Sequence, residues 1–195
     1  GTYKFPDGWF LRNVDNRTPY SSVAYVNEAW ERREDFSNNV LDSTAFSTSW
    51  YVPAGQADDW MWTPLIGPLP PNCLLKWKAI AYDPQYQDGY EVRVMTQAGG
   101  PPTGGTGAIG NQITNSTLAL SIPAENSTWT DRQLSLSAYA GQSVYIGFRN
   151  NSIDKFLLLI DDVVVEAVTN FDANLTAYVI PSNYSNIPLN QVSPI

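Results

Sequence analysis

The feature that most constrains this chain of 195 residues is its division into short apolar runs, separated by clusters of Asn, Asp, Gly and Pro. The runs are rich in β-branched and aromatic side chains, which is typical of strands. No window carries a sustained helical period with caps at both ends, so we predict an all-β chain. Many short strands at regular spacing favour a β-sandwich. The predicted strands are Trp9–Val14, Val23–Trp30, Phe46–Trp50, Cys73–Tyr82, Tyr90–Thr96, Thr117–Ile122, Arg132–Leu136, Ser143–Arg149 and Phe156–Glu166.

Alternation within these runs predicts which strands have one buried face. In Tyr90–Thr96 the side chains of Tyr90, Val92 and Val94 share one face of the strand, because successive side chains point to opposite sides. Phe156–Ile160 is apolar on both faces, which predicts a central strand that is covered on both sides. The least regular stretch is Val23–Glu34, whose end from Trp30 onward is also compatible with a turn of helix.

Two segments interrupt the strand pattern. The stretch between Gln97 and Asn111 is rich in Gly, Pro and Thr, and is predicted to be a long exposed loop without strands. After Glu166 the texture changes to that of a linker, followed by one more strand-like run. We therefore predict that residues 1–166 form a complete domain, and that 167–195 hold a linker and the first strand or strands of a truncated second domain.

Composition excludes several functions. The net charge is −8, and the 11 Lys and Arg residues are scattered rather than clustered. Binding to nucleic acid or to an anionic membrane surface needs a positive patch, so neither is predicted.

Cys73, the only cysteine, lies in an apolar run and is expected to be a buried, unreactive thiol. The sequence contains no run of about 18 apolar residues, so a membrane-spanning helix is not predicted. The low charged fraction of 15%, together with the many aromatic residues, is common in secreted β proteins, so we expect a secreted or cell-surface location.

The residue inventory also argues against catalysis. There is no His, which excludes a Ser-His-Asp triad and His-based zinc sites. A glycoside hydrolase needs only two carboxylates, and Asp83, Asp88, Glu91 and Glu125 are available, but nothing in the sequence pairs them. The chain is therefore predicted not to be an enzyme.

A series of motifs in a fixed order resembles a known family. The segments are Phe5–Trp9, Asp15–Asn16, Ser47–Trp50, Asp58–Pro64, Leu75–Ala79, Asp88–Val94, Leu136–Gln142, Ile146–Ser152 and Leu159–Val163. Together they resemble the cleaved-adhesin, or choice-of-anchor J, domains of Bacteroidetes surface proteins, with gingipain adhesin domains and MAM domains as more distant relatives. The resemblance implies a jelly-roll β-sandwich, bound calcium, a following immunoglobulin-like module and a role in adhesion.

Acidic residues suggest where a structural calcium ion would bind. Asp161 and Asp162 interrupt an apolar strand, so one carboxylate must face each side and needs a compensating partner. Calcium prefers mixed carboxylate and carbonyl oxygens, which the loop with Asp15 and Asn16 also offers. We expect the first and last strands to lie together and to bring these two regions into one site. Asp58 is a second candidate. The alternative is a structural Asp, bonded to backbone or paired with Arg149.

Aromatic residues fall into two groups. One interpretation of five of the seven Trp residues is a platform on which a sugar stacks: Trp9, Trp50, Trp60, Trp62 and Trp77. Three of these, Trp9, Trp60 and Trp77, belong to the family pattern, so packing in the core is the favoured interpretation. Residues outside that pattern and near loops are the candidates for an exposed ligand-binding surface: Tyr20, Tyr25, Trp30, Tyr82 and Tyr86.

We predict a non-catalytic surface adhesion module that binds a glycan or an extracellular protein beside neighbouring domains. A passive spacer and a glycan-acting hydrolase are the alternatives.

Overall fold

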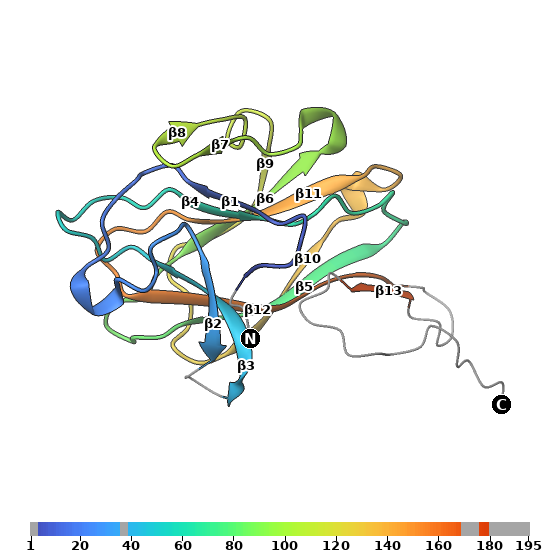
Figure 1. Ribbon diagram of the computed structural model, residues 1–195. Helices are drawn as coiled ribbons and strands as arrows, with labels where there is room; N and C mark the ends of the chain where they lie inside the picture. The colour runs from blue at the N-terminus through green and yellow to red at the C-terminus, as the bar shows by residue number, and fades with distance from the viewer. Residues whose placement is uncertain (1–3, 36–38, 169–175, 180–195) are drawn as a thin grey trace.

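The computed structural model describes residues 4–35, 39–168 and 176–179, and shows two antiparallel sheets packed face to face (Figure 1). The first sheet has the order β1 (Phe10–Asn13), β4 (Asp59–Trp62), β11 (Val144–Asn150), β6 (Tyr90–Thr96) and β9 (Thr117–Ile122). The second has the order β10 (Thr130–Ser135), β5 (Cys73–Ala81), β12 (Leu157–Ala167), β3 (Asn39–Thr48) and β2 (Glu31–Asp35). The all-β sandwich predicted from the alternation is confirmed.

The main core lies between the sheets. Val92 and Val94 of β6 meet Phe148 of β11 in this cluster, as their alternation predicted. Trp77 of β5 donates its indole N–H to the Tyr90 hydroxyl at 2.8 Å, so this buried polar group is satisfied inside an apolar core. Burying one large apolar side chain contributes about 1.5–3 kcal/mol, and the core contains many.

Strand β12 is central in the second sheet and apolar on both faces, as predicted. Leu158 and Ile160 face the main core, while Leu157 and Leu159 belong to a separate cluster on the outer face of the sheet. Val23, Val26 and the 3₁₀ turn η1 (Ser21–Val23) cover that outer cluster. The segment Val23–Trp30 is therefore a covering loop, and its prediction as a strand was wrong.

Two strands were missed because tertiary pairing, rather than local pattern, specifies them. Glu31–Asp35, where the sequence also allowed a turn of helix, is the edge strand β2 and pairs with β3. Asp59–Trp62 forms β4, which is inserted between β1 and β11 with all four of its residues buried.

The Gly/Pro-rich segment covers the outer face of the first sheet. It contains η2 (Gln97–Gly99) and a small hairpin of β7 (Gly104–Gly105) and β8 (Ala108–Ile109), which corrects the expectation of no strand. Figure 1 shows this hairpin above β1 and β4. Gly107 donates its N–H to Asn13 O at 2.9 Å, and Arg12 donates to Pro102 O at 2.7 Å, which fixes the cover to β1.

Beyond Ala167 the structure describes little. The strand β13 (Thr176–Val179) pairs with β12 and so joins the second sheet. Most of 167–195 lies outside the described residues, so the division into domains at 166 stays a prediction. Within the part of the chain that the structure describes, no helix has the length and apolarity needed to cross a membrane.

Candidate ligand-binding site at one end of the sandwich

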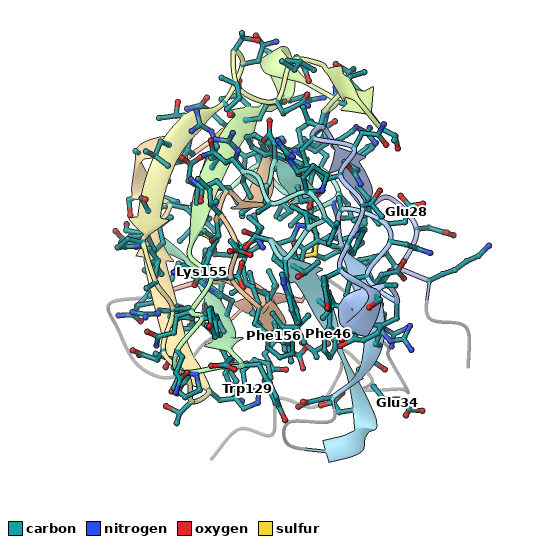
Figure 2. The ribbon with its side chains drawn as sticks, turned by 90° about the vertical axis from the view of Figure 1, so that its left-hand side faces the viewer. Glu28, Glu34, Phe46, Trp129, Lys155 and Phe156 are labelled. Carbon is teal, nitrogen blue, oxygen red and sulfur yellow. The ribbon has the colours of Figure 1, made fainter. Side chains whose placement is uncertain are left out.

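Three loops meet at one end of the sandwich and form a hollow of about 490 Å³. They connect β3 to β4, β5 to β6 and β11 to β12. The residues that line the hollow are Trp50, Asp83, Tyr86, Asp154, Lys155 and Phe156. Figure 2 faces this end, where the labelled Lys155 and Phe156 mark the loop before β12. We call this region the end site; its volume lies in the range of small-molecule sites.

Aromatic rings gather in and around the end site. Tyr20 stacks on Trp50 with ring centroids 4.3 Å apart and planes 10° apart. Phe156 packs edge-on against Trp50 at 5.8 Å, and Tyr82 lies 6.1 Å from Phe156. Tyr20, Tyr82 and Tyr86 are 38%, 39% and 52% exposed. The structure thus brings three of the five predicted ligand-binding residues together at one exposed surface.

The other two predicted residues are placed differently. Tyr25 is half-buried on the outer cluster, with the Arg33 guanidinium 4.8 Å above its ring. Burial raises the pKa of the Tyr25 hydroxyl. Trp30 is fully buried in the main core and donates its indole N–H to Asp59 O. Its prediction as an exposed residue was wrong, because Trp30 directly precedes the edge strand β2 and its side chain packs in the main core.

Sequence reasoning named Trp50 only as one member of a sugar-stacking platform and did not single out Phe156. Trp50 lies two residues after the end of β3, and Phe156 directly precedes the first residue of β12. An aromatic residue at the junction of an apolar strand and a polar loop is the signal that would have identified both.

Hydrogen bonds hold the loops of the end site in place. Asp154 donates its backbone N–H to Ser49 O, and Lys155 donates its N–H to Ser49 Oγ, both at 3.1 Å. Thr48 Oγ1 donates to Phe156 O at 2.6 Å. The β3–β4 loop therefore fixes the β11–β12 loop directly.

Asp88 lies beneath these loops and is fully buried. Its Oδ1 accepts from Ser49 Oγ at 2.7 Å and from Asn150 Nδ2 at 3.3 Å, while Oδ2 has no protein partner within the described residues. Burial raises the pKa of the Asp88 carboxyl to about 7, although the bonds from Ser49 and Asn150 oppose the shift. Asp88 thus anchors the serine that holds Asp154 and Lys155.

A second buried carboxyl, Asp59, is bonded to Tyr51. Tyr51 Oη lies 2.7 Å from Thr48 O and 2.6 Å from Asp59 Oδ2. The Tyr51 hydroxyl is the donor to these two acceptors, and Asp59 Oδ1 has no hydrogen-bond partner among the described residues. Burial, followed by the charge of Asp15, raises the pKa of Asp59 well above its usual range. Burial and the neighbouring acidic charge thus both oppose ionisation of Asp59.

The residues predicted to bind calcium lie in two places. Asp15 accepts backbone N–H groups from Arg17 and Asp58 at 2.7 and 2.6 Å. Asp58 accepts from Trp60 Nε1 and Arg149 Nε, both at 2.7 Å. Asn16 is exposed next to them in the left-handed region, with φ of 50°.

The second place is a β-bulge in β12. Asp161 Oδ1 accepts the N–H of Asp162 at 2.8 Å, and Asp162, with φ of 50°, pairs with Lys78 at 2.9 Å. Burial, then the nearby charges of Asp162, Asp42 and Asp35, raises the pKa of Asp161 to about 7.

Strands β1 and β12 do not pair, because they belong to different sheets, and Asp15 is bonded to Arg17 and Asp58 rather than placed beside Asp161. The expectation that Asp15 and Asp161 share one site was therefore wrong, and Arg149 pairs with Asp58 rather than with Asp161. Across the described ranges, no group of three or more Asp, Glu, His or Cys side chains is arranged to hold a metal ion. The five predicted ligands do not fit one ion.

The fold and the end site describe a β-sandwich module with loops that present aromatic residues at one end. No protein-family model matches the chain. The chain is 28% identical to Hemagglutinin A of Porphyromonas gingivalis in an alignment 225 residues long, which covers 97% of this chain. The chain spans 8% of that protein's length.

Solved structures extend this similarity to the fold. The K1 cleaved adhesin domain of Lys-gingipain from Porphyromonas gingivalis W83 matches with a TM-score of 0.59 and 20% identity, over 85% of this chain and 94% of that domain. The K3 cleaved adhesin domain matches with a TM-score of 0.53 and 20% identity, over 82% and 90%. The predicted jelly-roll β-sandwich and the resemblance to cleaved adhesin domains are confirmed.

Proposed function

We propose that this chain is a non-catalytic adhesion module of an exported, multidomain bacterial protein, and that its end site binds a glycan. The observation that carries the proposal is the convergence of exposed aromatic rings and polar side chains on one hollow. Aromatic rings pack well on the apolar face of a sugar, and a few placed polar groups orient it. The sequence similarity to Hemagglutinin A and the fold of the adhesin domains support the adhesive role and a secreted or cell-surface location.

Exposed apolar surface distinguishes this proposal from a passive spacer. Five of the large exposed hydrophobic residues belong to the loops at this end: Tyr20, Val52, Tyr82, Tyr86 and Ile153. Concentrated exposed apolar surface marks an interaction site, whereas a spacer has no need of it.

The carboxylates argue against the hydrolase alternative. Asp88 and Glu125 are fully buried, and Glu91 pairs with Arg93 and Arg149, so only Asp83 of the four sequence candidates lines the hollow. Asp154 is the second carboxylate there, but it is exposed and lacks the enclosed environment in which a catalytic acid works.

The test is binding of the purified chain to a glycan array, followed by calorimetry on the best ligand. We expect Tyr86→Ala and Trp50→Ala to weaken binding at least tenfold. Ile109→Ala, at a 77% exposed position on the covering hairpin, is the matched control and should bind like the wild type. Equal binding by all three variants would contradict the end site. Release of reducing ends from the bound glycan would instead support a hydrolase.

A further inference from the structure

The rim of the end site carries three charged side chains, namely Asp83, Asp154 and Lys155. Lys76, Lys78, Arg93, Arg132 and Arg149 each pair with an acidic side chain. By contrast, within the described part of the chain none of the three rim residues forms an ion pair. Their charged groups are therefore available to a ligand, while the charge of Lys155 also acts on the buried Asp88 carboxyl.

The Asp83 carboxylate and the backbone of Asp154 and Lys155 are held in place before any ligand arrives. Asp83 Oδ1 accepts the N–H of Gln85 at 2.7 Å, which fixes the carboxylate and leaves its second oxygen open. Asp154 has φ of 51° and is bonded through its N–H to Ser49, as is Lys155. A pre-organised site loses less conformational entropy on binding, so such groups favour specificity.

The chemistry of the rim selects among ligand classes. A carboxylate only accepts hydrogen bonds and an ammonium group only donates them, so the rim offers two acceptors and one donor. An anionic sugar would satisfy Lys155 but place its charge against two carboxylates, in a chain of net charge −8. A cationic side chain would satisfy the carboxylates but leave Lys155 desolvated without a partner. An apolar ligand would leave all three unsatisfied.

An uncharged sugar ring satisfies the whole rim at once. Each hydroxyl group both donates and accepts, so the ring's edge can meet Asp83, Asp154 and Lys155 together. The apolar face of the ring would then lie on the aromatic floor made by Trp50, Phe156 and Tyr86.

We propose that the end site selects uncharged glycans, with Asp83 and Asp154 accepting hydrogen bonds from sugar hydroxyls and Lys155 donating one. This inference rests on the proposed function, since it names the ligand class of the same site.

The experiment measures binding of the full chain to matched polysaccharides by affinity electrophoresis and calorimetry. Neutral probes are soluble glucans, mannans, galactans and xylans; acidic probes are polygalacturonate and heparin; polylysine is the cationic probe. We expect binding to at least one neutral probe and no measurable binding to the acidic or cationic probes at the same concentration. Asp83→Ala, Asp154→Ala and Lys155→Met should each weaken binding about tenfold, while Lys78→Met, outside the site, should not.

The outcomes separate this inference from the proposed function. Tightest binding to an acidic probe or to polylysine, lost in Tyr86→Ala, would overturn the preference for neutral sugars and keep the end site as a ligand site. Binding to a neutral probe that is unchanged in the three rim variants would also overturn the inference. If no probe binds, both the inference and the glycan-binding function are wrong. Thermal unfolding of each variant verifies that it is folded; Tyr86→Ala, at an exposed position, covers the case in which Trp50→Ala unfolds.

Discussion

Two stacked aromatic pairs in this molecule have opposite surroundings. Tyr20 and Trp50 stack at the end site, with Tyr20 partly exposed. Trp60 and Trp62 stack on the outer face of the first sheet, with centroids 5.5 Å apart and planes 4° apart, and both are fully buried. A stacked pair therefore does not by itself define a binding surface; what covers it does.

The cover over Trp60 and Trp62 comes from distant sequence. The segment 97–116 crosses this face, and Arg93 and Arg149 approach the Trp60 ring to 6.0 and 5.0 Å. Glu91 accepts hydrogen bonds from both guanidinium groups, so their charges are compensated. We call this region the covered face. The side chains of the covered face are buried like those of a core, whereas the end site has aromatic rings and charged groups that are exposed to solvent.

The largest expected effect is on stability at the covered face. Trp62→Ala removes a fully buried ring and should lower the free energy of unfolding by about 3–5 kcal/mol. Trp50→Ala, at a half-buried position, should cost less stability but weaken ligand binding at least tenfold. Urea unfolding followed by circular dichroism measures both. Equal losses of stability in the two variants would remove the distinction between the regions.

The second prediction concerns the buried carboxyl beneath the end site. Asp88 has a pKa of about 7 in the fold and 3.8 ordinarily. Between these values the native state binds more protons than the unfolded chain, so the free energy of unfolding falls as pH rises from about 4 to about 7. The total decrease in the free energy of unfolding that Asp88 causes over this pH range is on the order of 4 kcal/mol, at about 1.4 kcal/mol per pKa unit.

Asp88→Asn is the variant that isolates this contribution, because it keeps an oxygen for Ser49 and Asn150 and cannot ionise. Its free energy of unfolding should fall less than that of the wild type between pH 4 and 7, as measured by urea unfolding at each pH. Parallel pH profiles for the two proteins would show that Asp88 does not titrate in this window.

The third prediction tests how tightly the covered face is packed. A Cβ added to Gly147 would lie 2.7 Å from the Trp62 ring, so Gly147→Ala forces the ring or the strand to move. Overpacking of this kind costs about 1–3 kcal/mol. Gly105→Ala on the covering hairpin has nothing within 4 Å of its added Cβ and is the control. Thermal unfolding compares the two; no loss in Gly147→Ala would mean that the covered face is loosely packed.

Much of the fold was predictable because its signals are local. Tyr90–Thr96 and Thr117–Ile122 were predicted with the bounds that β6 and β9 have, since alternation and flanking turns specify them. Strand β4 was missed because its burial depends on β1, β11 and the cover, none of which is adjacent in sequence. The same limit applies to the covered face, where only the structure shows what lies over Trp62.

The candidate site was predictable by residue type but not by position. Tyr20, Tyr82 and Tyr86 were singled out because they lie near loops, and the structure gathers them at one end. Trp30 was grouped with them because a sequence does not show which way a side chain at a loop boundary points. Trp50 and Trp60 look alike in sequence, and only the placement of the loops separates an exposed ring from a buried one.

The smallest expected effect is the stabilisation of the chain by calcium. We expect any calcium ion to bind away from the covered face. Asp15 and Asp58 beside that face already accept N–H groups or pair with Arg149. Asp161 instead accepts the N–H of Asp162 on Oδ1, and nearby carboxylates repel its charge. We therefore expect 10 mM calcium to stabilise the chain by only about 1 kcal/mol relative to EDTA, through a weak site at Asp161. Thermal unfolding should show this gain in the wild type and in Asp15→Asn but not in Asp161→Asn. A gain lost in Asp15→Asn instead would tie calcium to the covered face, and no gain in metal-free protein would refute a calcium site.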